Sequence, residues 1–66
     1  MKKERFYKKY ILVLPCVYEN GLASNGKRYA RYINNDLDIT LGEYDKEWTK
    51  KEIIEDAFRE LNMFYS

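Results

Sequence analysis

Apolar and polar positions alternate with a period of two over much of the first two thirds of the chain, which indicates β-strands. Residues 6–18 are rich in aromatic and β-branched side chains and predict a first strand. Residues 27–33 predict a second strand, and residues 37–42 alternate strictly and predict a third. Because both faces of residues 10–14 are apolar, we expect the first strand to be central in its sheet or to have a second buried face.

Turn-forming residues separate these segments. Residues 19–26 contain two Asn-Gly steps, either of which suits a type I′ hairpin turn, so the sequence predicts a loop but leaves the strand register open. Pro15 cannot donate to a strand ladder, and pairing of the first strand should therefore end near it. Residues 34–36 predict the next turn. Residues 1–5 are polar and are expected to be frayed.

The last third of the chain changes to a helical period. Apolar residues recur at the spacing i, i+1, i+4, i+5 and i+8, namely Ile53, Ile54, Ala57, Phe58 and Leu61. Thr49 and Glu52 have the spacing of a capping box, which predicts the start of the helix. Glu55 and Arg59 predict a favourable ion pair one turn apart.

The order of elements predicts one small α+β domain over residues 1–66. Its simplest architecture is a three-stranded antiparallel sheet with one C-terminal helix on one face, β-β-β-α. The other sheet face is then open, and we expect it to carry apolar residues of the first strand and several tyrosines. Binding of a partner, including a second copy of the chain, is favoured over coverage of that face by the N-terminal residues.

Composition excludes several classes of function. The chain has 66 residues, of which 45% are hydrophobic and 17% aromatic, with no histidine and one cysteine. An intramolecular disulfide is impossible, and histidine-based catalysis and nearly all zinc sites are excluded. A domain of this size usually needs a disulfide, a metal or a partner to reach high stability. The composition therefore favours a well packed core or association with another molecule.

Charge is distributed unevenly although the net charge is +1. Residues 1–31 hold eight basic and two acidic side chains, whereas residues 32–66 hold four basic and nine acidic ones. The halves can pair on folding or present two surfaces of opposite sign. The longest apolar run, Tyr10–Tyr18, is far shorter than the ~20 residues that span a bilayer, so we expect no membrane segment and a cytoplasmic location.

Two sets of residues are candidate binding sites. The acidic set resembles a row of phosphates and consists of Asp36, Asp38, Glu43, Asp45 and Glu47. The basic and aromatic set resembles a nucleic-acid stacking surface and consists of Lys27, Arg28, Tyr29, Arg31 and Tyr32. The first set predicts docking on a basic groove of a partner protein, and the second predicts binding of nucleic acid.

The sequence gives less support to metal binding or catalysis. Asn34, Asp36 and Asp38 have a spacing similar to a calcium loop, but Ile39 replaces the required glycine, so we expect no metal site. Cys16 has no histidine to activate it and is expected to be a small buried side chain. The chain has no glycine-rich phosphate loop and no catalytic triad, so we expect no cofactor, no catalytic residues and no enzyme activity.

Compact size, the first-strand segment Tyr10–Pro15, a polar hairpin and the helix start Trp48–Ile53 together resemble short accessory proteins of bacteriophages and prophages of Gram-positive bacteria. That group includes anti-CRISPR proteins. The resemblance implies a stoichiometric inhibitor of a host or defence nuclease, acting by occlusion of a surface in the host cell cytoplasm. The alternatives are a nucleic-acid-binding module that uses the basic hairpin and a structural homo-oligomer.

Overall fold

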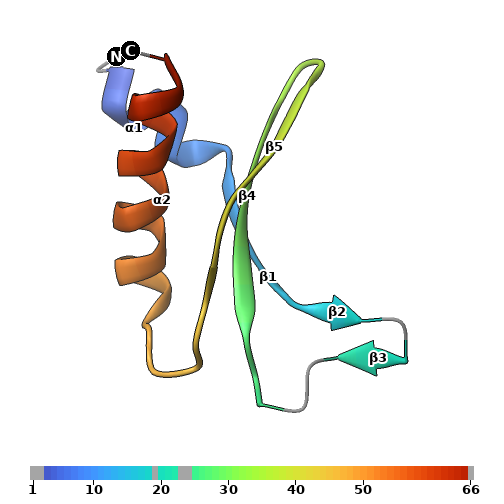
Figure 1. Cartoon of the computed structure of the whole chain (residues 1–66). Coiled ribbons are helices and arrows are strands. Elements are labelled where there is room, and N and C mark those ends of the chain that lie inside the picture. The colour runs from blue at the N-terminus through green and yellow to red at the C-terminus, as the bar shows by residue number, and fades with distance from the viewer. Residues whose placement is uncertain (1–2, 19, 23–24, 66) are drawn as a thin grey trace.

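The computed structural model describes residues 3–18, 20–22 and 25–65. The elements in chain order are α1 (Lys3–Lys9), β1 (Ile11–Pro15), β2 (Val17–Tyr18), β3 (Gly21–Leu22), β4 (Arg28–Asn34), β5 (Leu37–Tyr44) and α2 (Lys50–Tyr65). Strands β1, β4 and β5 form an antiparallel sheet, and α2 lies along one of its faces (Figure 1). The predicted α+β class, with a three-stranded antiparallel sheet and a C-terminal helix, is confirmed.

The central strand is β4, and the prediction of a central first strand is wrong. The strand order is β1-β4-β5, with Ile11 opposite Tyr32 and Val13 opposite Ala30. Consecutive antiparallel connections place the second of the three strands in the middle. The apolar residues on both faces of β1 are explained differently: Ile11 is buried against α2, whereas Leu12 on the other face is exposed.

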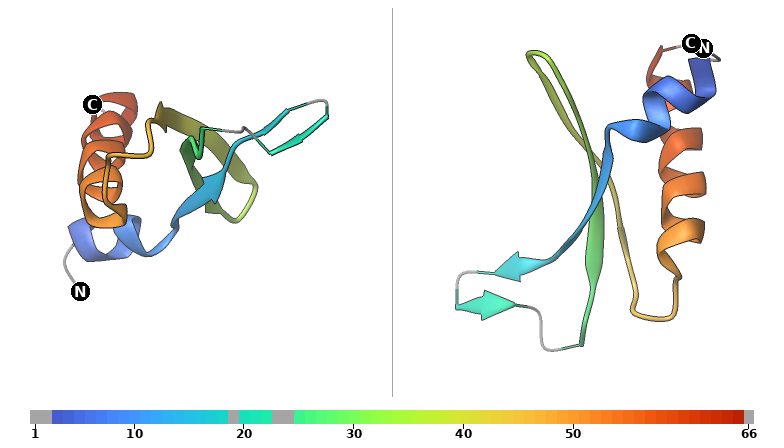
Figure 2. Two further views of the ribbon diagram at one scale, coloured as in Figure 1. Left: turned by 90° about the horizontal axis from the view of Figure 1, so that it is seen from below. Right: turned by 180° about the vertical axis from the view of Figure 1, so that it is seen from behind.

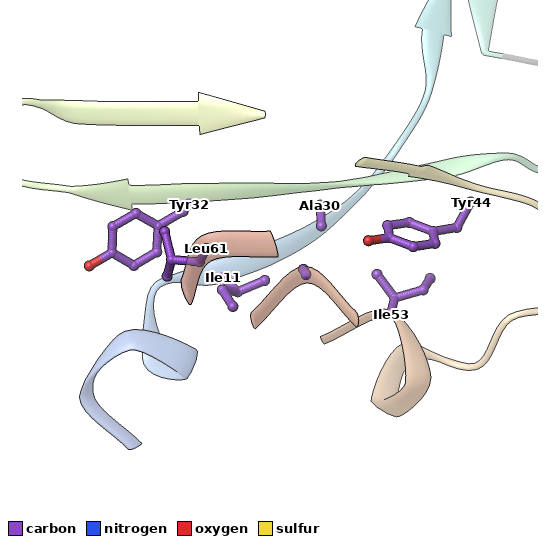
Figure 3. Close-up of a cluster of buried hydrophobic side chains, with 7 residues drawn as sticks. Ile11, Ala30, Tyr32, Tyr44, Ile53 and Leu61 are labelled. Carbon is purple, nitrogen blue, oxygen red and sulfur yellow. The ribbon is translucent and has the colours of Figure 1, made fainter. Parts of the chain in front are cut away.

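The core lies between α2 and the sheet. Its buried members are Ile11, Ala30, Tyr32, Tyr44, Ile53, Ala57 and Leu61. Figure 3 shows the rings of Tyr32 and Tyr44 at opposite ends of this cluster, with Ala30 between them. The three helical members follow the spacing i, i+4, i+8, and Ile54 and Phe58 pack at the margin, as the helical period predicted.

The capping box at the start of α2 is confirmed in both directions. The Thr49 amide donates to Glu52 Oε1 at 2.9 Å, and the Glu52 amide donates to Thr49 Oγ1 at 3.2 Å. The predicted pair of Glu55 with Arg59 is wrong. Lys8 Nζ bonds Glu55 at 2.7 Å instead, and Arg59 lies 3.3 Å from Asp56.

Helix α1 corrects the prediction that a strand begins at residue 6. Residues 3–5, expected to be frayed, form its first turn, and residues 1–2 lie outside the described residues. Phe6, Tyr7 and Tyr10 have the spacing i, i+1, i+4, which places them on one side of a helix. The ring of Tyr7 stacks on Tyr65 of α2 with centroids 5.3 Å apart. Tertiary packing of these aromatic residues thus overrides their β-propensity.

A two-stranded hairpin corrects part of the predicted loop over residues 19–26. Strand β2 pairs with β3, with Val17 opposite Leu22. Residues 19, 23 and 24 lie outside the described residues. The hairpin lies on the side of the sheet away from α2 (Figures 1 and 2). Pairing of β1 with β4 ends at Pro15, as predicted.

A β-bulge interrupts the alternation predicted for the third strand. Ala30 lies opposite Gly42, whereas Arg31 lies opposite Thr40, so Leu41 is the extra residue. The bulge turns Leu41 toward the core cluster. A Cβ atom at Gly42 would lie 2.9 Å from the hydroxyl oxygen of Tyr44, so a glycine is needed where the Tyr44 side chain crosses the strand.

Candidate functional site

The sheet face opposite α2 is the candidate functional site, and we call it the outer face. Residues paired across an antiparallel sheet share a face. The strand registers therefore place on it Leu12, Leu14, Tyr29, Arg31, Ile33, Asp38, Thr40 and Glu43. Within the described part of the chain no helix covers this face, and the β2–β3 hairpin projects beside it (Figure 2).

The apolar part of the outer face lies on β1 and continues onto the hairpin. Leu12, Val17 and Tyr18 are exposed, and Leu14 and Tyr29 are half-buried. The sheet contributes Tyr29 alone of the several tyrosines predicted here, because the other strand tyrosines, Tyr32 and Tyr44, are buried in the core cluster that includes α2 residues. Leucine, valine and tyrosine in one exposed area are typical of a protein contact surface.

A groove of about 400 Å³ runs between the hairpin and the outer face. Its lining consists of Cys16, Val17, Tyr18, Tyr29, Thr40, Leu41, Gly42 and Glu43. The Cys16 thiol is buried and unbonded to another cysteine, and burial, followed by the negative charge of Glu43, raises its pKa. A thiol that resists ionisation is a poor nucleophile, which agrees with the predicted structural role of Cys16.

Ion pairs across β4 and β5 neutralise the charged part of the outer face. Arg31 Nε donates to Asp38 Oδ1 at 2.7 Å, and a second nitrogen of Arg31 bonds Asp38 Oδ2. The hydrogen bonds from Arg31 lower the pKa of Asp38, and those to Asp38 raise the pKa of Arg31. Lys27 Nζ lies 3.7 Å from Glu43 and 3.8 Å from Asp45. The basic and acidic segments of the sequence thus pair with each other.

The acidic set does not gather into one surface. Asp36 and Asp38 lie at the β4–β5 turn, whereas Glu43 lies near the other end of β5, and Asp45 and Glu47 lie in the connection from β5 to α2. Because Leu41 is the extra residue of the bulge, Asp38 and Asp45 are separated by six strand positions, about 20 Å at about 3.3 Å per residue. Two separate groups of carboxylates, three members of which contact Lys27 or Arg31, make a weak imitation of a continuous phosphate row.

The basic and aromatic set is divided between the two faces. Tyr29 and Arg31 lie on the outer face with the ion pairs above. Arg28 bonds the backbone oxygen of Trp48, and Tyr32 is fully buried in the core. Burial raises the pKa of Tyr32, although its hydroxyl accepts a hydrogen bond from Asn34 Nδ2 at 3.1 Å. A buried ring cannot stack on a base, so this set offers one half-buried aromatic platform, Tyr29.

The described residues bring no three histidine, cysteine, aspartate or glutamate side chains together in a metal-binding group.

In the core, the Tyr44 hydroxyl donates a hydrogen bond to Asp56 Oδ2 at 2.9 Å. Burial, followed by that hydrogen bond, raises the pKa of Tyr44. This favours the neutral phenol, which anchors α2 to β5. Among the described residues, no helix is long and apolar enough to cross a membrane.

Sequence reasoning did not find the part of the site that the hairpin contributes. The sequence pattern places Val17 and Tyr18 in the first strand, but the chain leaves the main sheet after Pro15. Pro15 was the available signal, because a strand rarely continues its pairing through a proline. The uneven distribution of charge along the sequence also does not require a binding site. Basic side chains at β4 form ion pairs with acidic side chains of the adjacent strand β5.

No protein-family model, no curated protein and no solved structure matches this chain.

Proposed function

We propose that this protein is a small non-enzymatic module that acts by binding a partner protein through its outer face. One observation carries the proposal: α2 covers a single face of the sheet, and the opposite face displays exposed apolar side chains. Leu12 on the outer face is exposed by 43%, and Val17 and Tyr18 on the adjoining hairpin are exposed by 68% and 52%. Apolar side chains in one uncovered area of so small a domain favour a function by contact.

The charge of the outer face favours a protein over a nucleic acid. Binding to a nucleic acid requires lysine and arginine side chains that are free to neutralise phosphates. Here Arg31 is held by two hydrogen bonds to Asp38, and Lys27 lies between two carboxylates. A surface with an apolar centre and internally paired charges matches the usual composition of a protein interface.

A narrower proposal is that the partner is a host or defence nuclease, of the CRISPR type, and that the chain inhibits it by occlusion. Support comes from the compact size and from the sequence resemblance to short phage accessory proteins. The separated acidic groups favour occlusion by the outer face over imitation of DNA. Inhibition of this type is stoichiometric and needs no catalytic residue.

Binding through the outer face can be tested with Val17→Lys and with Asn62→Lys as the matched control. Both positions are exposed, and Asn62 lies on α2. We expect affinity capture from bacterial lysate to recover a partner with the native protein and Asn62→Lys, and to lose it with Val17→Lys. Recovery that does not depend on Val17 would contradict the proposal.

The narrower proposal has a separate test. Purified RNA-guided nucleases are titrated with the protein while plasmid cleavage is measured, and we expect inhibition that saturates at equal molarity and is lost in Val17→Lys. Absence of inhibition across such enzymes would refute the nuclease proposal, and the capture experiment would still test the binding module by itself.

A salt-sensitive mobility shift with DNA or RNA, abolished by Arg31→Glu, would favour the nucleic-acid alternative. A dimer in light scattering that Val17→Lys dissociates would favour self-association.

A further inference from the structure

The outer edge of β5 has hydrogen-bonding groups to which no strand of the described chain pairs. In the strand order β1-β4-β5, one side of β5 faces β4, and none of the strands in the described residues lies on its other side. The amide of Ile33 donates to the Tyr10 oxygen at 3.2 Å, so odd-numbered residues of β4 direct their backbone groups toward β1. Even-numbered residues of β4 then direct theirs toward β5.

This alternation identifies the free groups. Tyr32 and Asn34 pair with Ile39 and Leu37, which therefore use their backbone groups within the sheet. Asp38 lies between Leu37 and Ile39, and Thr40 follows Ile39. The backbone N–H and C=O groups of Asp38 and Thr40 therefore point away from β4, toward the open edge. An exposed row of such groups is a template for another extended chain.

The opposite edge of the sheet is protected. The amide of Cys16 donates to the Lys27 oxygen at 3.0 Å, so in β1 it is the backbone groups of Ile11, Val13 and Pro15 that point away from β4. Pro15 has no N–H, which shortens the usable edge of β1 to two donors. Strand β5 is longer than β1 and has no proline, and its edge is the better acceptor of a strand.

An apolar groove lies beside the open edge. Its volume is about 310 Å³, and it is lined by Ile39, Thr40, Leu41, Glu60, Met63 and Phe64. Met63 and Phe64, on the last turns of α2, are exposed by 69% and 59%. A chain paired to β5 would direct every second side chain to the α2 side of the sheet, where this groove can receive it.

Glu60 gives the groove its charge. It is the one charged residue among the six that line the groove, and it has no lysine or arginine within ion-pair distance in the described part of the chain. Strand β5 contains no lysine or arginine, so a second copy of β5 paired at this edge could not place a basic side chain opposite Glu60. The charge therefore favours a basic partner over another copy of this chain.

We infer that the edge of β5 and the groove beside α2 bind an extended segment of a partner protein by strand addition. The segment has apolar side chains at alternate positions, and a lysine or arginine two residues from one of them faces Glu60. Backbone hydrogen bonds to Asp38 and Thr40 supply affinity, and the groove and Glu60 supply specificity. This goes beyond the proposed function, which uses the outer face, and either can fail without the other.

The test uses a displayed library of random ten-residue peptides as the probe. We expect selected peptides to have apolar residues at alternate positions with a lysine or arginine two residues from one of them, and, in NMR titrations, to shift the amides of Asp38 and Thr40 and the methyl groups of Leu41 and Met63. Glu60→Lys should weaken binding at least tenfold, whereas Glu47→Lys, the same charge change outside the groove, should not. N-methylation of the peptide backbone should also weaken binding at least tenfold.

Thr40→Pro removes an outward donor without removing a hydrogen bond to β4 and should weaken binding, whereas Thr40→Val should not. If Thr40→Pro fails to fold by circular dichroism, the Glu60→Lys and N-methylated-peptide results decide. No enriched peptide, shifts confined to the outer face, or equal binding by Glu60→Lys would overturn the inference. Dimerisation of the free protein through the same amides would also overturn it, because the occupant would then be a second copy.

Discussion

Two buried tyrosine hydroxyls should make the fold sensitive to alkali. Tyr44 is 6% exposed and donates to Asp56 Oδ2 at 2.9 Å, and Tyr32 is fully buried. Burial, and for Tyr44 also the contact with Asp56, raises both pKa values above the ordinary 10.0. The folded chain therefore retains two protons that the unfolded chain releases above about pH 10.

The sign follows from which state releases its protons first. The stabilisation is complete below pH 10 and is lost as the pH rises above it, because the unfolded state is then favoured by ionisation. Above pH 10 the ionisation of Tyr44 in the unfolded state lowers the free energy of unfolding by about 1.4 kcal/mol per pH unit, and Tyr32 adds a loss of the same sign. The free energy of unfolding of a domain of this size is about 3–10 kcal/mol in total. We therefore expect the alkaline loss to remove a substantial part of this free energy by about pH 12.

Urea unfolding followed by the fluorescence of Trp48, the single tryptophan, measures this effect because its ring centroid lies 5.0 Å from that of Tyr44. Tyr44→Phe should lose about 1–2 kcal/mol at neutral pH. Above pH 10 its stability should fall less steeply than that of the native protein, by about 1.4 kcal/mol per pH unit. Tyr18→Phe, at an exposed position, should match the native protein. Equal slopes in Tyr44→Phe and the native protein would refute the reasoning.

Three further predictions concern the helix cap, the core and the buried thiol, and the first two use the same unfolding measurements. Thr49→Ala should lower the free energy of unfolding by about 1 kcal/mol because the Glu52 amide loses its acceptor, and an unchanged urea midpoint would contradict this. Leu61→Ala should cost about 2–5 kcal/mol because the side chain is fully buried, and a loss below 1 kcal/mol would show that the core does not enclose it. The Cys16 thiol should react with a disulfide reagent far more slowly in the native protein than in urea, since burial raises its pKa; equal rates would place it at the surface.

Local signals predicted the elements that short-range chemistry determines. Thr49 and Glu52 define the start of α2 by mutual hydrogen bonds, and Ile53, Ala57 and Leu61 mark its buried side. The sheet class followed from alternation in the same way. These features depend on residues within about one helical turn or on one face of a strand. The order of residues along the chain is therefore enough to predict them.

Features that depend on distant partners could not be predicted. Phe6 and Tyr7 suit a strand by propensity, but packing against Tyr10 and Tyr65 holds them in a helix. The pairing of Lys8 with Glu55 joins residues 47 positions apart, and no local pattern identifies it. Of the candidate sites, Tyr29 and the ion-paired Arg31 and Asp38 lie together on the outer face, whereas burial removes Tyr32.

The two edges of this small sheet differ in how well they are protected against pairing with another strand, and this difference supports a function by contact. Side-chain charges that could discourage strand addition at β5 are instead directed to the outer face, where Asp38 bonds Arg31 and Glu43 lies near Lys27. The edge of β1, by contrast, ends in a proline whose missing donor faces outward. Exposed strand edges carry a risk of aggregation, and natural proteins usually block them. A chain that protects one edge and leaves the other beside an apolar groove has its unprotected groups where a partner strand can use them.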